Sequence, residues 1–148
     1  MPLDQSFVGR SLPPATPYQV GREKVREFAA AIGAVDAAHH DLDAARAAGH
    51  RDVVAPPTFP IVISGAALAG LYADPAFGLD FSRVVHGEQR FEHRRPIVAG
   101  DEIVCVNTVE EITSRGGNEF LSTRSDLATT AGEPVATVFA KLVVRGEG

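Results

Sequence analysis

The stretch "TFPIVISGAALAGLYA", residues 58–73, decides the fold. It contains no charged residue and is apolar nearly all round, so a helix over 58–73 must be covered on most of its surface. The stretch has 16 residues, fewer than the roughly 20 needed to span a bilayer, which favours a buried helix. Prolines just before it predict a start near Pro57 or Thr58. Gly65 and Gly70 each cost about 1 kcal/mol of helix propensity, so packing must offset them.

The sequence becomes strand-like from residue 82 onward. Glycine-containing turn sequences divide this part into four predicted strands, at 82–95, 102–114, 118–129 and 134–145. The last strand is apolar on both faces, so we expect it to be central or covered on both sides. His86 and His93 are seven residues apart in the first strand, which predicts that they point to opposite faces. Either is expected to line the mouth of a pocket or to pair across strands.

Two shorter helices are predicted ahead of the apolar stretch. Residues 21–33 carry apolar side chains at helical spacing, and Gly33 is well placed to end that helix. Residues 41–49 predict a short second helix that Asp41 or Asp43 caps at its start.

Together these elements predict a single α+β domain over 1–148. An apolar helix followed by a four-strand antiparallel meander is covered most economically by a sheet that curls around the helix. This is the hot dog fold, a long central helix wrapped by a curved antiparallel sheet. A sheet this small usually finishes burying its helix by dimerisation.

The composition argues against several classes of partner. The chain has 14 Lys and Arg against 19 Asp and Glu, a formal net charge of -5, and no basic run, so nucleic acid is not expected. The single cysteine, Cys105, lies in an apolar strand-like run and is expected to be a reduced, buried thiol. We therefore expect a cytoplasmic protein, without a signal peptide in "MPLDQSFVGR" and without a membrane partner.

The segment "GAVDAAHHDLDAARAAGH", residues 33–50, collects the residue types of acid/base chemistry. His39 and His40 stand among carboxylates that include Asp36, which makes these three residues the candidate catalytic groups. Adjacent histidines rarely converge on one ion, and no second cluster has ligand spacing, so no metal is expected. The alternative is that they are a pair of solvated loop histidines without a catalytic role.

Several blocks of the chain resemble the MaoC-like hot dog dehydratase family. They are "GREKVREFA" (21–29), "VVAPPTF" (53–59) and "HGEQRFEHRRPIVAGDEI" (86–103), in that order. The likeness is to the N-terminal-type, FAS1-like dehydratase domain, particularly the subunits of mycobacterial-type (3R)-hydroxyacyl-[acyl-carrier-protein] dehydratases and related actinobacterial proteins. It implies 3-hydroxyacyl or trans-2-enoyl thioesters of acyl-carrier protein or coenzyme A as substrates, and it implies no cofactor.

The resemblance also implies where the catalytic groups should be. Active members carry an Asp and a His separated by four residues, and a backbone N–H near the start of the central helix holds the thioester oxygen. If His39 takes the histidine position, the aspartate position falls on Ala34, and the glycine that supplies the N–H falls near Pro56. An alanine cannot hold an imidazole or move a proton, and proline has no N–H to donate to the thioester oxygen.

These departures leave several functions open. The first is a non-catalytic subunit that contributes acyl-chain binding and forms a heterodimer with a catalytic MaoC-like hot dog partner. The second is a self-sufficient enoyl-CoA hydratase in which Asp36 pairs with His39 or His40. The third is a non-enzymatic acyl-thioester binding module, and a thioesterase is a weaker fourth. The expected assembly is a homodimer or a heterodimer.

Four residues are the candidates for substrate binding. Thr58, Phe59 and Ser64 belong to the predicted helix, whose apolar surface is suited to wall an acyl tunnel. Arg94, in the cluster "RFEHRR", is suited to meet the phosphates of a pantetheine carrier or an acidic carrier protein.

Overall fold

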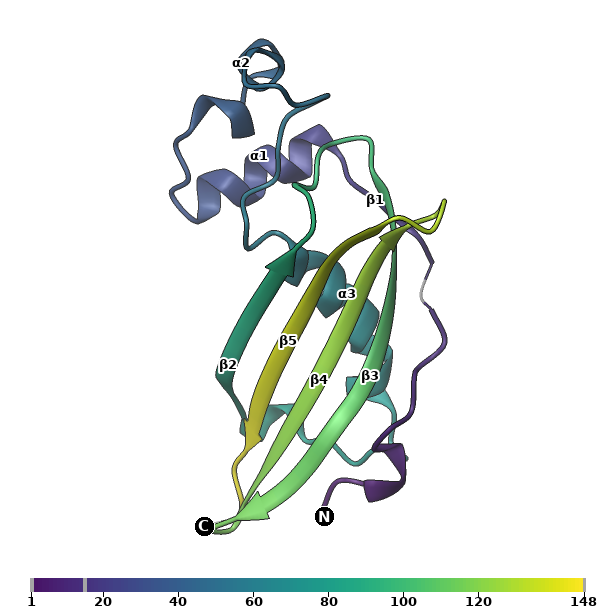
Figure 1. The fold of residues 1–148 in the computed structure, drawn as a ribbon. Coiled ribbons are helices and arrows are strands. Elements are labelled where there is room, and N and C mark those ends of the chain that lie inside the picture. The colour runs from purple at the N-terminus through teal and green to yellow at the C-terminus, as the bar shows by residue number, and fades with distance from the viewer. Residues whose placement is uncertain (1, 15, 148) are drawn as a thin grey trace.

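In the computed structural model, which describes residues 2–14 and 16–147, an antiparallel sheet of five strands curls around one long helix, α3 (Figure 1). The strands are β1 (Tyr18–Gln19), β2 (Val84–His93), β3 (Glu102–Arg115), β4 (Asn118–Thr129) and β5 (Pro134–Val144). The predicted α+β hot dog fold is therefore confirmed, and the four long strands agree with the predicted ranges to within two residues at each end.

The central helix α3 (Pro60–Ala73) begins two to three residues later than predicted. Phe59 already has helical dihedral angles and is fully buried, and Pro60 occupies the first turn, where its missing N–H costs nothing. Ile63, Leu68 and Leu71 are buried against the sheet. Burial of these side chains supplies the stabilisation that the glycine-containing helix lacks by propensity alone.

The strand order is β1-β3-β4-β5-β2, so the predicted four-strand meander is wrong for its first strand. Strands β3, β4 and β5 do form a meander, but β2 pairs with β5 at the far side of the sheet. The reason is the segment 94–101, which crosses the end of the sheet and bonds to residues 53–55 instead of making a tight turn. Its bonds run from the Ala55 amide to the Ile97 carbonyl (2.8 Å) and from the Ala99 amide to the Val53 carbonyl (3.0 Å).

A β-bulge at Gly87 corrects the predicted orientation of two histidines. His86 pairs with Leu142 and His93 with Ala136. Those partners are an even number of residues apart on β5, so both histidines face the same side, toward α3. The bulge inserts one extra residue into β2 and thereby reverses the alternation that the sequence predicts. A Cβ on Gly87 would lie 3.1 Å from the Lys141 carbonyl oxygen, which explains the glycine.

The helices ahead of α3 gather over one end of the sheet (Figure 1). They are α1 (Arg22–Ala31), the 3-10 helix η2 (Ala37–His39) and α2 (Leu42–Ala47), and the remaining 3-10 helices are η1 (Gln5–Phe7) and η3 (Phe81–Arg83). Asp41 caps α2 by accepting a hydrogen bond from the Ala44 amide, as predicted. Gly33 has a φ of 72° just after α1, which confirms it as the stop signal.

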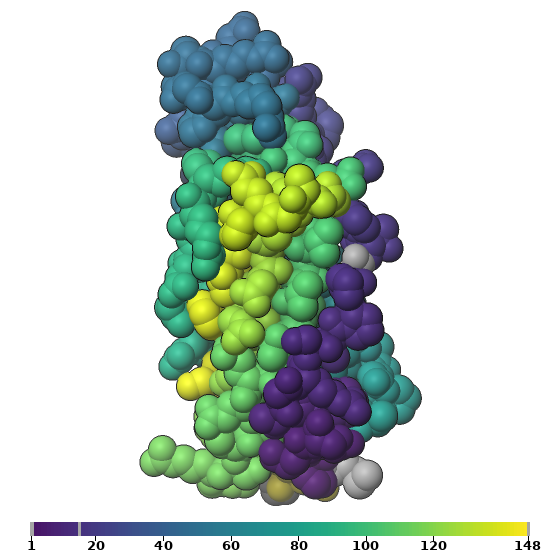
Figure 2. All heavy atoms as spheres, turned by 45° about the vertical axis from the view of Figure 1, so that its right-hand side comes forward, coloured from purple at the N-terminus to yellow at the C-terminus, as the bar shows by residue number. Residues whose placement is uncertain are grey.

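The chain covers one long edge of its own sheet. The Gly9 amide bonds to the Val109 carbonyl and the Leu12 amide to the Asn107 carbonyl, both at 2.8 Å. Figure 2 shows this N-terminal segment, in purple, lying along the green atoms of β3. The hydrogen-bonding groups on that side of β3 are therefore partly satisfied within the chain.

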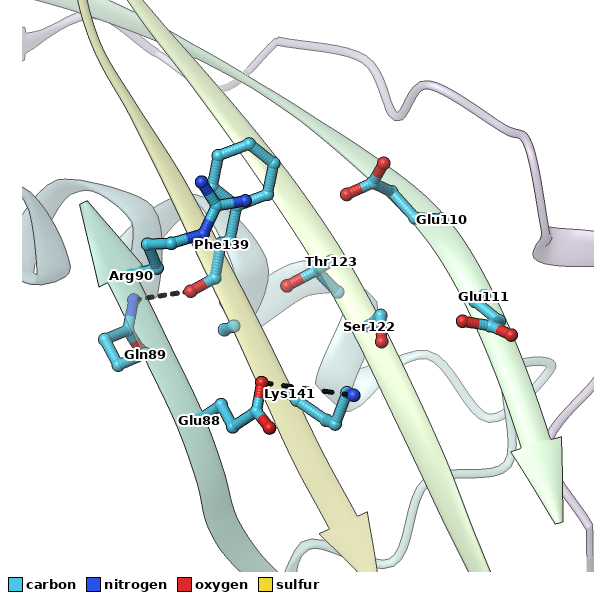
Figure 3. Close-up of a pocket in the computed structure, with 10 residues that line it drawn as sticks. Glu88, Gln89, Arg90, Glu110, Glu111, Ser122, Thr123, Phe139 and Lys141 are labelled. Atoms are coloured by element: carbon cyan, nitrogen blue, oxygen red, sulfur yellow. Dashed lines mark hydrogen bonds and ion pairs between the residues drawn. The ribbon is translucent and has the colours of Figure 1, made fainter. Parts of the chain in front are cut away.

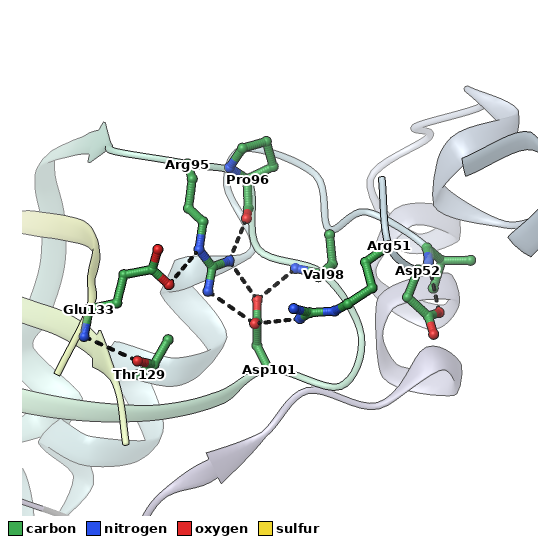
Figure 4. Close-up of polar contacts among 9 residues, drawn as sticks. Arg51, Asp52, Arg95, Pro96, Val98, Asp101, Thr129 and Glu133 are labelled. Carbon is green, nitrogen blue, oxygen red and sulfur yellow. Dashed lines mark hydrogen bonds and ion pairs between the residues drawn. The ribbon is translucent and has the colours of Figure 1, made fainter. Parts of the chain in front are cut away.

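Asp101 ties the crossing segment to its neighbours (Figure 4). Its side chain is 3 % exposed and accepts hydrogen bonds from Arg95 (2.9 and 3.0 Å), from Arg51 (2.9 Å) and from the Val98 amide (2.9 Å). Burial by itself raises the pKa of Asp101, but the bonds from Arg95 and Val98 outweigh burial and place the pKa below the ordinary carboxyl value. The carboxylate therefore stabilises the fold in its charged form.

We predict that Asp101→Asn lowers the free energy of unfolding by about 3 kcal/mol at neutral pH, because it leaves two arginines facing a neutral group. The pKa of Asp101 is lower in the folded state than in the unfolded state. Its contribution to the free energy of unfolding is therefore present above the unfolded-state pKa of about 3.9 and is lost as the pH falls through the folded-state pKa. Urea unfolding at pH 7 and at acid pH measures both effects. Glu102→Gln, next in sequence and exposed, is the control, and equal stability of the two variants at pH 7 would contradict the prediction.

Candidate functional site

A cleft of about 480 Å³ lies where the end of β2 meets the approach to α3. Its walls are His39 at the end of η2, residues 54–57 ahead of α3, and residues 93–97 at the end of β2. We call it the His39 cleft and the segment 53–57 the strap. The cleft exists because the strap bonds to the crossing segment on one side and to η2 on the other.

Two histidines hold the strap from opposite walls of the cleft. A ring nitrogen of His39, Nδ1, lies 2.7 Å from the Val54 carbonyl oxygen, and Nε2 of His93 lies 2.7 Å from the Pro57 carbonyl oxygen. A carbonyl only accepts, so these nitrogens carry the hydrogens. Nε2 of His39 and Nδ1 of His93 are thereby left available as acceptors when the rings are neutral.

Asp36 is committed to the backbone and holds neither imidazole. Its Oδ1 accepts a hydrogen bond from the Ala38 amide at 2.9 Å and caps η2, although the loop does contain the helical turn that could have brought the groups together. His40 Nε2 lies 2.8 Å from the Ala34 carbonyl oxygen. Among the described residues no ion pair joins His39 or His40 to a carboxylate.

The strap offers no free backbone donor to a ligand. The amides of Val53, Val54 and Ala55 bond to Asp52 Oδ1, the Ala38 carbonyl and the Ile97 carbonyl, at 2.8 to 3.0 Å. Pro56 and Pro57 have no N–H. No backbone amide of the strap is therefore free to stabilise an oxyanion.

The arginines beside the cleft are engaged elsewhere. The Arg94 guanidinium donates to Thr137 Oγ1 at 3.1 Å, and that hydroxyl in turn donates to Asp126 at 3.3 Å. Arg95 pairs with Asp101 and with Glu133. No carboxylate side chain of a described residue lines the cleft.

The predicted substrate-binding residues in α3 and just before it do not line the His39 cleft. Ser64 is 1 % exposed and lines a separate chamber of about 120 Å³ between α3 and strands β2, β4 and β5. Phe59 is buried in the core, where its ring packs edge-on against Phe28 with the centroids 5.4 Å apart. Thr58 is exposed at the start of the helix.

The chamber is mostly apolar, with hydroxyls on two walls. Leu68 and Val138 face it, as do Ser64 and Ser125 from opposite walls, and Tyr72 lies at its rim beside Phe81 with the ring centroids 5.6 Å apart. Burial raises the pKa of Tyr72 to about 12, so its phenol stays protonated at physiological pH. Burial likewise raises the pKa of Cys105 to about 11, so this thiol is not a nucleophile.

A wider hollow of about 850 Å³ lies on the outer face of the sheet (Figure 3). Most of its charged side chains have an oppositely charged partner within the chain, and Glu110 pairs with Arg124 and Arg90 with Glu92. Glu88 lies 4.0 Å from Lys141, and the Arg90 guanidinium sits 3.9 Å from the centroid of the Phe139 ring. It therefore presents a solvated polar surface.

The part of the chain that the structure describes contains no cluster of three or more His, Cys, Asp or Glu side chains arranged to hold a metal ion. It also contains no helix that is long and apolar enough to cross a bilayer.

The sequence identified His39 as a candidate catalytic residue. For His93 it predicted only that the side chain lines the mouth of a pocket or pairs across strands. It missed that residues 53–57 and 94–99 pair with each other and so form the walls of the cleft. The signal was weak: both segments are short apolar runs that contain or adjoin prolines. Such runs do not reveal their partners before the crossing connection is known.

Comparison with known proteins places the chain among hot dog dehydratases. A UPF0336 protein of Saccharopolyspora erythraea is 53 % identical over 146 residues, which covers 99 % of this chain and 94 % of that protein. A solved MaoC-like dehydratase superposes with a TM-score of 0.87 at 32 % identity, over 96 % of this chain. This chain spans only 43 % of the length of that dehydratase.

A second solved structure is a heteromeric enzyme. The HadBC complex of Mycobacterium tuberculosis, a (3R)-hydroxyacyl-ACP dehydratase, superposes with a TM-score of 0.84 at 26 % identity, and the match covers 93 % of this chain and 96 % of that one. Residues 6–138 match the family described as the FAS1-like dehydratase domain region. The chain therefore belongs to this MaoC-like hot dog dehydratase family.

Proposed function

We propose that this protein is a subunit of a (3R)-hydroxyacyl thioester dehydratase, or (R)-specific enoyl hydratase, in cytoplasmic fatty-acid metabolism. In this proposal it binds the acyl chain of a coenzyme A or acyl-carrier-protein thioester, and a partner hot dog subunit supplies the catalytic groups. The observation that carries the proposal is the strap, in which three amides are engaged and two prolines have none.

The chemistry explains why that observation matters. Dehydration of a 3-hydroxyacyl thioester removes a proton from carbon 2 and expels the 3-hydroxyl as water, while negative charge grows on the thioester oxygen. Removal of the proton needs a base held in position and donors aimed at the thioester oxygen, and departure of the 3-hydroxyl as water needs an acid that returns a proton to it. Loss of one oxyanion donor alone commonly costs about 100- to 1000-fold in rate.

His39 lacks the support that a general base requires. Its ring is oriented by the Val54 carbonyl, which cannot share or relay a proton, and Asp36 caps η2 instead. The position implied for the catalytic carboxylate is Ala34, whose methyl group has no acid/base function. A partner that brings its own Asp, His and amide N–H removes the deficit, and the heteromeric HadBC complex is a precedent among similar proteins.

The chamber beside Ser64 suits the acyl chain. Its volume of about 120 Å³ is close to that of an apolar cavity of about 150 Å³ that binds benzene, so it has room for a short acyl group. Arg94 at the end of β2 remains our candidate for the phosphates of the carrier, because its guanidinium forms no ion pair with the carboxylates of described residues.

A self-sufficient hydratase is the second candidate. Two imidazoles in one cleft, His39 and His93, each keep a ring nitrogen that can accept a proton. In this alternative Asp36 must leave its cap to pair with His39 or His40. A non-enzymatic acyl-thioester binding module is the third.

We predict that the purified chain alone hydrates crotonyl-CoA at a rate near background. Addition of a catalytic MaoC-like subunit from the same organism should raise turnover well above that of the partner alone, because the assembly then contains both the acyl chamber and the acid/base pair. The absorbance of the enoyl thioester measures both rates. Turnover by the lone chain, or no gain with any candidate partner, would argue against the proposal.

Replacing His39 and His40 with alanine distinguishes the first two candidates. We expect the mixed assembly to keep most of its turnover, because neither ring is held by a carboxylate. A general base typically contributes about 100-fold or more, so a loss of that size in the double variant would favour the self-sufficient hydratase. Circular dichroism of the variant checks that the strap, which His39 supports, has kept its fold.

Filling the chamber tests acyl binding without requiring catalysis. Ser64→Leu should weaken the binding of butyryl-CoA by about tenfold or more, since the larger side chain occupies the space of the acyl group. Isothermal titration calorimetry measures the affinity. Ala30→Leu, on the exposed side of α1, adds the same side chain at a distance and should have no effect. Equal weakening by both variants, or by neither, would count against the chamber.

A further inference from the structure

One buried hydroxyl has no partner among the residues that the structure describes. Thr123 of β4 is 2 % exposed, and its Oγ1 is a buried side-chain oxygen to which no described residue forms a hydrogen bond. An unpaired hydroxyl in the interior destabilises a protein, because it has given up its bonds to water and gained none in return. A buried polar group of this kind calls for an explanation.

Thr123 lies on the side of the sheet that faces α3. Its neighbours at alternate positions, Leu121 and Ser125, are both buried, and successive side chains of a strand point to opposite faces. Thr123 is directly opposite Ala140 of β5. Both Ala140 and Ser125 line the chamber beside Ser64. Thr123 also borders the outer hollow, but a hydroxyl on that solvated face would not be buried. The unpaired hydroxyl therefore adjoins the chamber.

The two serine hydroxyls that line the chamber keep capacity for a further bond. Ser125 Oγ donates to Asn107 Oδ1 at 2.5 Å, so its lone pairs remain able to accept. Ser64 Oγ donates to the Ile61 carbonyl at 3.4 Å, which is long for a hydroxyl donor. Together with Thr123, these groups place unused hydrogen-bonding capacity on the sheet wall and on the helix wall.

The polar side chains at the β2 wall of the chamber are, by contrast, satisfied within the chain. Nε2 of His86 lies 2.7 Å from Gln89 Oε1, and Gln89 Nε2 donates to the Phe139 carbonyl at 3.2 Å. The capacity for a new hydrogen bond is thus concentrated on the β4 and α3 walls.

A ligand hydroxyl complements these walls. Thr123 has a hydrogen to donate, whereas Ser125 has given its hydrogen to Asn107 and is left as an acceptor. A hydroxyl can accept from the first and donate to the second, a carbonyl oxygen can only accept, and a methylene can do neither. Residues two apart in a strand are separated by about 6.6 Å. Two hydrogen bonds of about 2.8 Å each that meet at one oxygen bridge most of that distance.

We infer that the chamber takes an acyl chain that carries a hydroxyl group beyond carbon 3, bound between Thr123 and Ser125. The inference rests on the proposed function, in which the acyl chain enters this chamber, and it adds the chemical class of that chain. The 3-hydroxyl is a different group, because in the proposed function it leaves as water at the catalytic groups of the partner. Leu68 and Val138 give the chamber apolar walls that suit the neighbouring hydrocarbon.

Matched pairs of thioesters test the inference by binding alone. The probes are hexanoyl-CoA with 5-hydroxyhexanoyl-CoA, and octanoyl-CoA with 7-hydroxyoctanoyl-CoA, each titrated calorimetrically into the purified chain. We expect the wild type to bind the hydroxylated member of at least one pair about tenfold more tightly, since only that ligand pairs the buried donor. Thr123→Val, which keeps the shape of the side chain, should abolish the preference. Thr113→Val, the same change at an exposed position of β3, should retain it.

Thermal unfolding of the same variants checks the premise separately. Thr123→Val removes an unpaired buried hydroxyl, so it should raise the unfolding midpoint by a few degrees. Thr113→Val should leave the midpoint near that of the wild type. A midpoint that falls in Thr123→Val would show that the hydroxyl is already bonded within the protein, and this would overturn the inference.

The binding results separate this inference from the proposed function. A preference for a hydroxylated thioester that is lost in Thr123→Val and kept in Thr113→Val supports it. Equal or weaker binding of both hydroxylated probes by the wild type, or a preference that survives in Thr123→Val, overturns it and leaves acyl binding to the chamber intact. Absence of binding by all four probes overturns the chamber as an acyl site and the inference with it.

Discussion

An apolar helix that must be covered on most of its surface governs this structure. The residues of α3 form no polar face that could be exposed to water, so the sheet curls around the helix. This curl explains the strand order. Strand β2 must continue the wrap beside β5, and the chain then crosses the end of the sheet to start β3. That crossing segment, fixed by Asp101, positions the strap and with it the His39 cleft.

The same constraint explains why the cleft is poor in catalytic groups. The strap is held by backbone bonds on both sides and by two histidine side chains, so its backbone donors are engaged within the fold. Two prolines stiffen it and lead directly into α3. A segment that serves as a structural tie in this way has little capacity left to stabilise a reaction, and this is the physical basis for assigning the chemistry to a partner.

Much of the fold was predictable because its signals are local. The long apolar run of α3, the cap at Asp41 and the stop at Gly33 depend on neighbouring residues. The failures concern pairings between distant segments. Nothing near residue 94 indicates that β2 pairs with β5, and one bulge at Gly87 reversed the faces assigned to His86 and His93. The cleft was only half predicted for the same reason: His39 has a sequence signal, but its bond to Val54 depends on tertiary structure.

The central claim is that the His39 ring is held by a carbonyl and not by a carboxylate. Nitrogen-15 NMR of the histidine side chains tests it most directly, at a pH where the ring is neutral. The account predicts the tautomer with hydrogen on Nδ1, which donates to Val54, and the same spectrum in Asp36→Asn. A ring protonated on Nε2 alone, or one whose tautomer changes when Asp36 is neutralised, would show that the carboxylate serves the imidazole and would contradict the account.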